Sequence, residues 1–328
     1  MNLTIRRAGF LTTVQDLGRS GFRQFGVAVG GALDPHALRV ANLLVGNDES
    51  AAGLEIAFGG LQVRVSDDRI AAWCGGDFEA RVGSNAIPAG HVFVLRRGEE
   101  FTIDRPRTGC RAWLTISGGI DVPLVLNARS TDLRANFGGL DGRALRDGDE
   151  LKLDRNSERA KILLERLRNE RTAAWKPPHD WSSPARREPL VHFVRGTDWI
   201  RFDDVMSQRF TNEPFIVSPD SDRMGVRFEA PELKRQDAVD LISEAVAPGT
   251  VQVPPSGKPI LLLGDCQTIG GYPKIAHVIT VDLPIAAQLR AGDAVHFREV
   301  SLAEAHRLWV ERECHLAQFR RGLETRFA

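Results

Sequence analysis

The sequence predicts a mainly β protein of two lobes, with a few short helices and one helix at the C-terminus. Short apolar segments such as 61–65, 91–95 and 260–263 recur between Gly, Pro, Asn and Asp residues, at the spacing of sandwiches and barrels. A weak internal echo indicates two lobes, because Leu145–Leu153 and Leu289–Phe297 each place a Gly-Asp turn before a strand of alternating apolar residues. Chance is the alternative explanation, since Gly-Asp turns are common.

Helices are predicted at three places. Asp34-Pro35 offers an N-cap followed by Pro at the first helical position, and this helix should end after Val45 at Gly46-Asn47. A capping-box pattern at Ser301 starts a helix that covers most of the C-terminus. The charged segment 156–171 is expected to be helical, with a linker at 175–184. The expected divisions are an N-terminal β-barrel lobe at 1–154, a charged helix and linker at 155–188, a C-terminal β-barrel lobe at 189–300 and a C-terminal helix at 301–328.

Composition excludes several classes of protein. The 328 residues carry 43 basic and 43 acidic side chains, so nothing favours binding to nucleic acid or to an acidic membrane surface. No segment has the length and apolarity of a signal peptide or a membrane span. The four cysteines, at 74, 110, 266 and 314, are too far apart for a CxxC site and make a disulfide framework unexpected. The expected location is the cytoplasm, and no metal site is expected from the scattered histidines.

Motifs for familiar cofactor chemistry are missing from the sequence. It contains no Walker A loop, no GxGxxG between a strand and a helix, no GxSxG elbow and no Met-Lys-Met biotin attachment sequence. A nucleotide site would therefore need another geometry or belong to another chain.

Four polar clusters are unusual: 12–19 with 26–34, then 118–139, 218–225 and 264–273. Glycines beside Asp, Gln, Ser and Arg let a ligand approach the backbone where charged side chains converge. For each cluster, an ordinary turn with local polar contacts is the alternative explanation. The cluster at 264–273 is the most suggestive, because it follows a wholly apolar strand and holds Tyr272, the one tyrosine of the chain.

These clusters resemble the 5-oxoprolinase C-subunit family, also described as KipA-like, allophanate hydrolase subunit 2 or biotin-dependent carboxyltransferase. The resemblance covers roughly residues 3–153 and 190–300. The matching segments, in order, are Thr12–Arg19, Gly30–Asp34, Ala41–Asn47, Leu54-Glu55, Gly118–Pro123, Ser221–Gly225, Val251–Pro254 and Asp265–Pro273. Three positions depart from the family pattern: Thr197 stands where Pro is usual, Asn127-Ala128 where Gly-Ser is common, and Ile269 where a second Thr is usual. The Ile269 change removes a hydroxyl from the most suggestive loop, so substrate or partner preference could differ.

The resemblance implies two cyclophilin-like β-barrel lobes and partner subunits. It implies the C subunit of an ATP-dependent 5-oxoprolinase, which works with a KipI-like B subunit, related to it in fold, and with an A subunit to open the 5-oxoproline lactam to glutamate. ATP and Mg²⁺ are expected at the level of the complex, and no biotin is expected on this chain. The expected catalytic residues are Asp265, Tyr272 and Gln267. The expected substrate- or phosphate-binding residues are Arg19, Asp16, Asp222, Arg223, Thr268, Gly270 and Gly271, with no metal ligands in the set.

The roles of these residues rest on their chemistry. Lactam opening needs positive charge near the phosphoryl oxygens and the substrate carboxylate, for which Arg223 and Arg19 are candidates. Asp265 could act as a base or bind a metal, while Gln267, Thr268 and Tyr272 could position the substrate. Two other functions stay open: carboxyl transfer from carboxybiotin on another protein to a urea-like substrate, and non-enzymatic regulation by binding a kinase inhibitor that resembles the B subunit.

Overall fold

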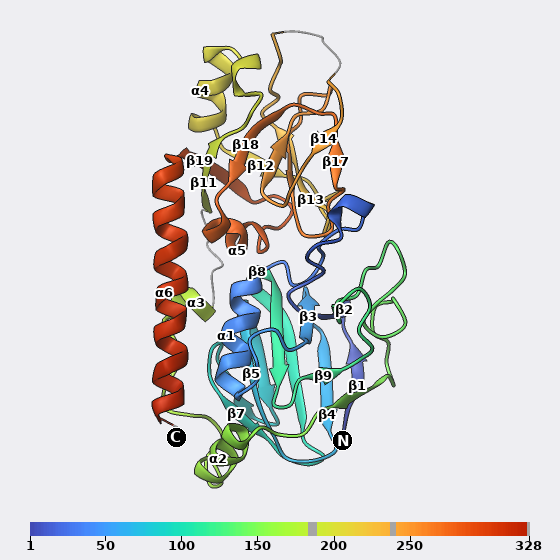
Figure 1. Ribbon diagram of the computed structural model, residues 1–328. Coiled ribbons are helices and arrows are strands. Elements are labelled where there is room, and N and C mark those ends of the chain that lie inside the picture. The colour runs from blue at the N-terminus through green and yellow to red at the C-terminus, as the bar shows by residue number, and fades with distance from the viewer. Residues whose placement is uncertain (183–188, 237–240, 327–328) are drawn as a thin grey trace. The chain divides into compact units, whose positions relative to one another are not determined.

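The computed structural model describes residues 1–182, 189–236 and 241–326. The predicted linker residues 183 and 184 lie outside these ranges. The chain divides into two compact units. Unit 1 comprises Met1–Arg19, Gly30–Ala185 and His315–Ala328, and unit 2 comprises Ser20–Val29 and Arg186–Cys314. The structure is mainly β with few helices, as predicted (Figure 1).

Unit 1 is built on one strongly curved sheet whose strands run in the order β2-β3-β8-β4-β1-β10-β9, with β5 added alongside β8. The longest strands, β5 and β8, form the antiparallel pair at its centre. The strands are β1 Asn2–Ala8, β2 Leu11–Gln15, β3 Gly53–Ala57, β4 Leu61–Val65, β5 Arg69–Val82, β6 Asn85–Ala86, β7 Phe93–Leu95, β8 Glu100–Ile116, β9 Ile120–Asp121 and β10 Glu150–Leu153; the helices are α1 Pro35–Val45, α2 Glu158–Arg166 and α3 His179–Ser182.

The core of unit 1 follows from alternation along the strands. In β4, Leu61, Val63 and Val65 are buried while the residues between them are partly exposed, so one face of the strand lines the core. Helix α1 packs against β5 and β8. Asp34 caps it as predicted, with Oδ1 accepting from the Ala37 N–H at 2.8 Å, and the helix ends at Gly46 in the left-handed conformation.

Unit 2 contains a closed barrel with strand order β11-β18-β15-β16-β13-β12-β19, closed by parallel pairing of β11 with β19. Its interior is rich in aromatic rings. The rings of Phe193, Phe210, Phe215, Phe228 and Phe297 lie in mutual edge-to-face or stacked contact. The strands are β11 Leu190–Arg195, β12 Phe215–Val217, β13 Gly225–Ala230, β14 Glu244–Ala245, β15 Thr250–Gln252, β16 Ile260–Leu262, β17 Ile269–Gly270, β18 Lys274–Val278 and β19 Ala294–Glu299.

The helices of unit 2 are short apart from the last one. Helices α4 and α5 cover Asp204–Asn212 and Leu283–Ala286, and short 3₁₀ turns cover Arg23–Phe25 (η1), Trp199–Arg201 (η2) and Thr280–Asp282 (η3). Helix α6 covers Leu302–Arg326 and contributes its first part to unit 2 and its remainder to unit 1. The Ser301 hydroxyl accepts from the Glu304 N–H at 3.1 Å, which confirms the predicted start of the C-terminal helix.

The internal echo corresponds to two turns of the same geometry. Gly148 and Gly292 have φ angles of 89° and 86°, which favour glycine. In each turn the aspartate that follows the glycine accepts a hydrogen bond from a backbone N–H three residues before it. The distances are 2.7 Å for Arg146 N to Asp149 Oδ2 and 2.8 Å for Arg290 N to Asp293 Oδ2. Each turn leads directly into a strand, β10 in unit 1 and β19 in unit 2.

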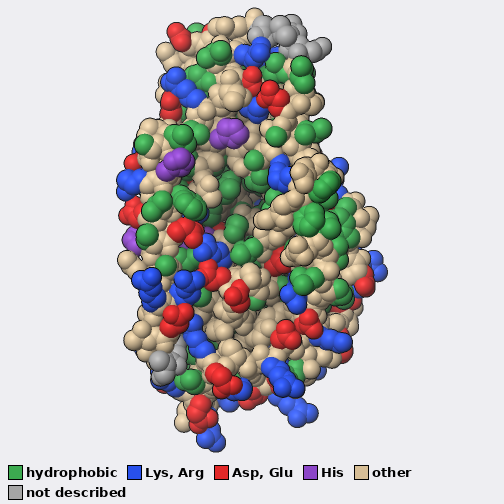
Figure 2. Space-filling view, in the orientation of Figure 1, with side chains coloured by type: hydrophobic (Ala, Val, Ile, Leu, Met, Phe, Trp, Pro, Cys, Tyr) green, Lys and Arg blue, Asp and Glu red, His purple; other side chains and the backbone are tan. Residues whose placement is uncertain are grey.

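Two predicted elements are shorter than expected. The charged helix is limited to Glu158–Arg166, because Ser157 caps its N-terminus and the chain turns after Arg166. The strand predicted at 91–95 pairs only from Phe93 to Leu95. None of the helices in the described part of the chain is both long and apolar enough to cross a membrane. On the face shown in Figure 2, basic and acidic side chains lie intermingled, as equal numbers of the two would suggest.

Candidate functional site

A cavity of about 520 Å³ opens in unit 2 beside β13, β15 and β16. Its volume falls in the range of small-molecule sites. Polar groups dominate the lining: two carboxamides, three hydroxyls, two basic and two acidic side chains. The lining residues are Ser218, Asp220, Met224, Gly225, Arg227, Phe228, Glu229, Gln252, Pro254, Ser256, Lys258, Pro259, Ile260, Leu262, Gln267 and Tyr272.

The predicted loop at 264–273 reaches this cavity through Gln267 and Tyr272. The loop follows β16, and its Ile269–Gly270 part pairs with Glu244–Ala245 to form the two-stranded β14–β17 sheet. The Val246 N–H donates to the Thr268 carbonyl at 3.1 Å, which continues this pairing. The loop is therefore held by backbone bonds on the side of β14, and its polar side chains are left for other contacts.

A chain of amide contacts links the loop to the barrel wall. Gln267 Nε2 donates to Gln252 Oε1 at 3.2 Å, and Gln252 Nε2 donates to the Tyr272 carbonyl at 3.3 Å. Gln252 is only 1% exposed, so its side chain is fixed by these bonds. A Cβ at Gly270 would lie 2.7 Å from Gln252 Nε2, which explains why a glycine stands there. The Tyr272 side chain is 45% exposed and lines the cavity from its rim.

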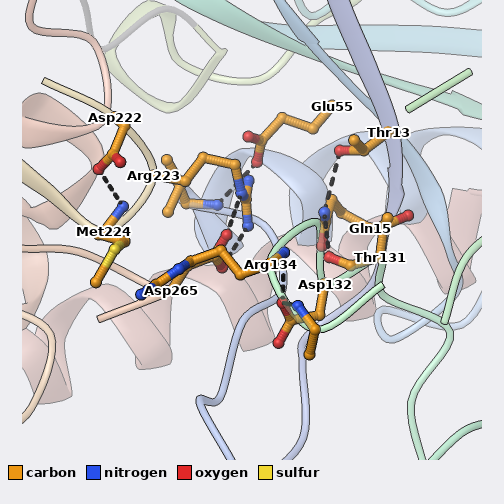
Figure 3. A network of polar contacts seen from close by, with 12 residues as sticks. Thr13, Gln15, Glu55, Thr131, Asp132, Arg134, Asp222, Arg223, Met224 and Asp265 are labelled. Carbon is orange, nitrogen blue, oxygen red and sulfur yellow. Dashed lines mark hydrogen bonds and ion pairs between the residues drawn. The ribbon is translucent and has the colours of Figure 1, made fainter. Parts of the chain in front are cut away.

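Asp265 and Arg223, two further predicted site residues, contact each other directly (Figure 3). Arg223 Nε donates to Asp265 Oδ2 at 2.8 Å, and Nη2 donates to Oδ1 at 3.0 Å. Both side chains are buried. This bidentate pair joins the end of the 218–225 cluster to the start of the 264–273 loop. Asp222 shapes the adjacent turn, since its Oδ1 accepts from the Met224 N–H at 2.8 Å.

Asp16 and Arg19 lie in unit 1, where they hold two loops together. Asp16 Oδ1 accepts from the Gly18 N–H at 2.9 Å and from the Ser130 hydroxyl, and Oδ2 accepts from the Arg129 N–H at 2.5 Å. Arg19 donates to the Ser130 carbonyl and lies 4.5 Å over the Phe137 ring. These contacts give both side chains a structural role within unit 1, and they join the predicted cluster at 12–19 to that at 118–139.

The other predicted residues have backbone roles in the loop. The Thr268 carbonyl takes part in the β14–β17 pairing. A Cβ at Gly271 would lie 3.1 Å from the Leu241 carbonyl oxygen, so this glycine allows close backbone approach. The structure thus brings Gln267 and Tyr272 to one cavity. Asp265, which precedes Gln267 by two residues, is paired with Arg223. Asp16 and Arg19 lie in the other unit.

Sequence reasoning did not select several polar side chains of the cavity as site residues, among them Gln252, Arg227 and Lys258. The signal for Gln252 was available, because it is a carboxamide between two valines, Val251 and Val253. Arg227 and Lys258 gave no such signal, since charged residues beside a barrel usually lie on its solvated surface. Among the residues that the structure describes, no group of three or more His, Cys, Asp or Glu side chains is arranged to hold a metal ion.

The comparisons with known proteins agree on one family. The model of the carboxyltransferase domain, subdomain A and B, matches residues 25–299. The chain is 42% identical over 306 residues to the 5-oxoprolinase C subunit of Escherichia coli, covering 92% of this chain and 93% of that protein. It is 36% identical over 314 residues to the 5-oxoprolinase C subunit of Haemophilus influenzae, covering 96% of both. The structure of Kluyveromyces lactis urea carboxylase superimposes with a TM-score of 0.88 at 25% identity, covering 97% of this chain and 29% of that one. The chain belongs to the 5-oxoprolinase C-subunit family.

Proposed function

We propose that this chain is the C subunit of an ATP-dependent 5-oxoprolinase complex and that its unit 2 cavity binds the 5-oxoproline lactam. The observation that carries the proposal is the 42% identity to a C subunit of 5-oxoprolinase along nearly the whole of both chains. The cavity supports it, because carboxamides, hydroxyls and basic side chains are the groups that would recognise a small cyclic amide with a carboxylate.

The Gln267 carboxamide is suited to form hydrogen bonds with the N–H and C=O groups of a lactam. The ring of a lactam forces its N–H and C=O onto the same edge, where they present one donor and one acceptor side by side. A carboxamide presents the complementary pair. Within the described residues, Gln267 uses one N–H for Gln252, which leaves its second N–H and its oxygen for a ligand. Donation to the lactam carbonyl would withdraw electron density from it and weaken amide resonance.

The basic side chains of the cavity would hold the substrate carboxylate. Arg227 and Lys258 both line the cavity, and either can donate charge-assisted hydrogen bonds to a carboxylate. Arg223 is less available for this role, since two of its donors already bind Asp265. We therefore assign carboxylate binding to Arg227 and Lys258 and a positioning role to the Arg223–Asp265 pair.

The phosphoryl chemistry is assigned to the complex. The sequence has no Walker A loop, and the described side chains do not form a cluster suited to a metal ion. We assign no ATP or Mg²⁺ site to the residues of this chain. In our proposal, the A and B subunits complete the reaction, in which the lactam C–N bond breaks, the oxygen of water joins the carbonyl carbon and the ring nitrogen becomes the amine of glutamate. The coupled hydrolysis of ATP to ADP and phosphate consumes a second water molecule.

Carboxyl transfer to a urea-like substrate is the second candidate. The matching family model is that of a carboxyltransferase domain, and the fold matches urea carboxylase of Kluyveromyces lactis over 97% of this chain. Urea presents the same amide edge as a lactam but has no carboxylate. The Arg227 and Lys258 side chains could instead bind the carboxyl group that is transferred, so the preference for 5-oxoproline rests on the 42% identity to a C subunit of 5-oxoprolinase. The sequence also lacks a Met-Lys-Met biotin attachment sequence, so a carrier would have to come from another protein.

The test is ATP-dependent glutamate release from 5-oxoproline by this chain with its cognate A and B subunits, each omitted in turn. We expect activity that requires this chain. A parallel assay with a carboxybiotin carrier and urea tests the second candidate. A fully assembled, folded complex that releases no glutamate overturns the oxoprolinase assignment, and urea carboxylation in the parallel assay would replace it.

A further inference from the structure

A short segment from the N-terminal part of the chain belongs to unit 2. Residues Ser20–Val29, here called the strap, group with unit 2, while Arg19 and Gly30 on either side belong to unit 1. The chain segments on either side of the strap lie next to each other, because the Ala32 N–H donates to the Asp16 carbonyl at 2.9 Å. A Cβ at Gly31 would lie 2.8 Å from the Gly18 nitrogen, so the two flanks are in close contact. Such a loop with adjoining ends resembles the Ω-loops that often have functional roles.

Arg23 attaches the strap to the base of the β14–β17 sheet. Its Nη2 donates to the Val246 carbonyl, and its guanidinium lies near the Cys266 thiol. Val246 and Cys266 are both buried and pack together with Leu262 in a small apolar cluster. Arg23 itself lies in the 3₁₀ turn Arg23–Phe25, which ends at Gly26 in the left-handed conformation. This turn therefore fixes the direction from which the Arg23 guanidinium reaches the Val246 carbonyl.

The contacts of Arg23 are unusual for a half-buried cation. Within the part of the chain that the structure describes, no carboxylate pairs with this guanidinium, and its Nη1 atom is buried without a hydrogen-bond partner. A guanidinium bound to a backbone carbonyl recovers less of its lost hydration than one bound to a carboxylate. The contacts of Arg23 therefore contribute little to the stability of the strap itself. They point to a role for Arg23 in ordering the neighbouring 264–273 loop.

That loop carries the candidate substrate-binding amide. Three consecutive residues are each held in place: Asp265 by Arg223, Gln267 by Gln252, and Cys266 by packing against Val246, whose carbonyl binds Arg23. We propose that Arg23 is a positioning residue, through which the strap holds the backbone at Cys266 so that the Gln267 carboxamide stays at the cavity. The kinetic part of this inference rests on the proposed function, whereas the structural part does not.

The structural part is tested by the reactivity of Cys266 in the intact chain. Cys266 is fully buried, as are Cys74 and Cys110 of unit 1, while Cys314 is exposed. Each thiol is alkylated with N-ethylmaleimide under native conditions and quantified by peptide mass spectrometry. In Arg23→Ala we expect Cys266 to react about tenfold faster, as local opening of the loop becomes easier by ~1.4 kcal/mol. Cys74 and Cys110 should stay protected, and Cys314 serves as the internal reference.

Two further variants make the result decisive. Arg23→Lys keeps the charge but lacks the planar fork of donors of a guanidinium, and we expect intermediate reactivity at Cys266. Arg195→Ala removes an arginine of an exposed ion pair in the same unit and should leave Cys266 protected. Equal protection of Cys266 in Arg23→Ala and in the unmodified chain overturns the proposal. Simultaneous exposure of Cys74, Cys110 and Cys266 also overturns it, because Arg23 would then support the whole fold and not this loop.

The kinetic part is tested in the complex with 5-oxoproline. We expect Arg23→Ala to raise KM about tenfold with a smaller change in kcat, because substrate binding needs an ordered Gln267. Partial recovery in Arg23→Lys would accompany the partial protection of Cys266. An unchanged KM together with a reactive Cys266 overturns the positioning role. If the complex of unmodified subunits does not act on 5-oxoproline, the proposed function fails, and the alkylation result still decides whether Arg23 holds the loop.

Discussion

Arg223 and Asp265 form a buried bidentate ion pair, with Nε–Oδ2 and Nη2–Oδ1 distances of 2.8 and 3.0 Å. The side chains are only 8% and 9% exposed. By chemistry, Asp265 could be a catalytic group and Arg223 an anion-binding group. In the structure, however, the carboxylate and the guanidinium bind each other. A loss of activity on replacing either one would therefore report on the loop they hold as much as on chemistry.

Breaking this pair should destabilise unit 2. Arg223→Ala leaves a buried carboxylate without its partner, and we expect the free energy of unfolding to fall by about 3 kcal/mol. Urea denaturation of the isolated chain, followed by circular dichroism, measures the change. Glu299→Gln is the matched control, because the Arg195–Glu299 pair is exposed and should contribute at most about 1 kcal/mol. A loss in Arg223→Ala as small as that of the control would contradict the buried pair.

The two Gly-Asp turns should respond alike to substitution. Gly148 and Gly292 both have left-handed φ angles, and a Cβ at either position would meet no atom within 4 Å. The cost of Gly148→Ala and of Gly292→Ala should therefore come from backbone strain alone, about 1–2 kcal/mol each. Thermal or chemical unfolding of both variants checks the prediction. A substantially larger loss of unfolding free energy in one variant than in the other would contradict the expectation that the two turns are energetically equivalent.

Stability should fall in acid partly through Glu99. Hydrogen bonds from the Arg171 guanidinium hold the pKa of the Glu99 carboxyl below its usual range. A carboxyl whose pKa is depressed by folding contributes stability above its unfolded pKa, about 4.3, and loses it as the pH falls through the folded pKa. Glu99→Gln should therefore lower stability at pH 7 and flatten the loss of stability below about pH 4.5. Denaturation curves across this range give the slope, and an unaltered acid slope in the variant would refute the assignment.

Gly270→Ala should impair substrate binding with little effect on folding. The added methyl group would lie 2.7 Å from Gln252 Nε2 and would displace the amide that holds Gln267. We expect KM for 5-oxoproline to rise about tenfold in the complex. Gly322→Ala in helix α6 is the control, because a Cβ there would meet no atom within 4 Å. Wild-type kinetics in Gly270→Ala would show that the Gln252–Gln267 contact is not needed.

Local signals in the sequence predicted much of the fold. Asp34-Pro35 and Gly46 mark the ends of α1 because capping and left-handed residues act within one turn. The same applies to Ser301 and to the Gly-Asp turns. The assignment of Ser20–Val29 to unit 2 could not be read in this way, because it depends on contacts of Arg23 with residues more than 200 positions later.

The candidate site was only partly predictable for a similar reason. Gln267 and Tyr272 stand in a polar loop after an apolar strand, which is a visible signal. The pairing of Arg223 with Asp265 is not visible, since two opposite charges 42 residues apart fit a site and an ion pair equally well. Arg227 and Lys258 look like surface residues until the barrel brings them to the cavity. Sequence chemistry selects candidates, and only the fold shows which of them already bind one another.

The most direct test of the cavity is the kinetics of Gln267→Ala and Gln267→Glu in the assembled complex, with glutamate release from 5-oxoproline as the readout. Gln267→Glu keeps the size of the side chain but replaces the N–H donors with a carboxylate that repels the substrate carboxylate. We predict a loss of at least about tenfold in kcat/KM for both variants, larger for Gln267→Glu, with complex assembly unchanged. Activity close to that of the unmodified complex in both variants would contradict the claim that the unit 2 cavity binds the lactam.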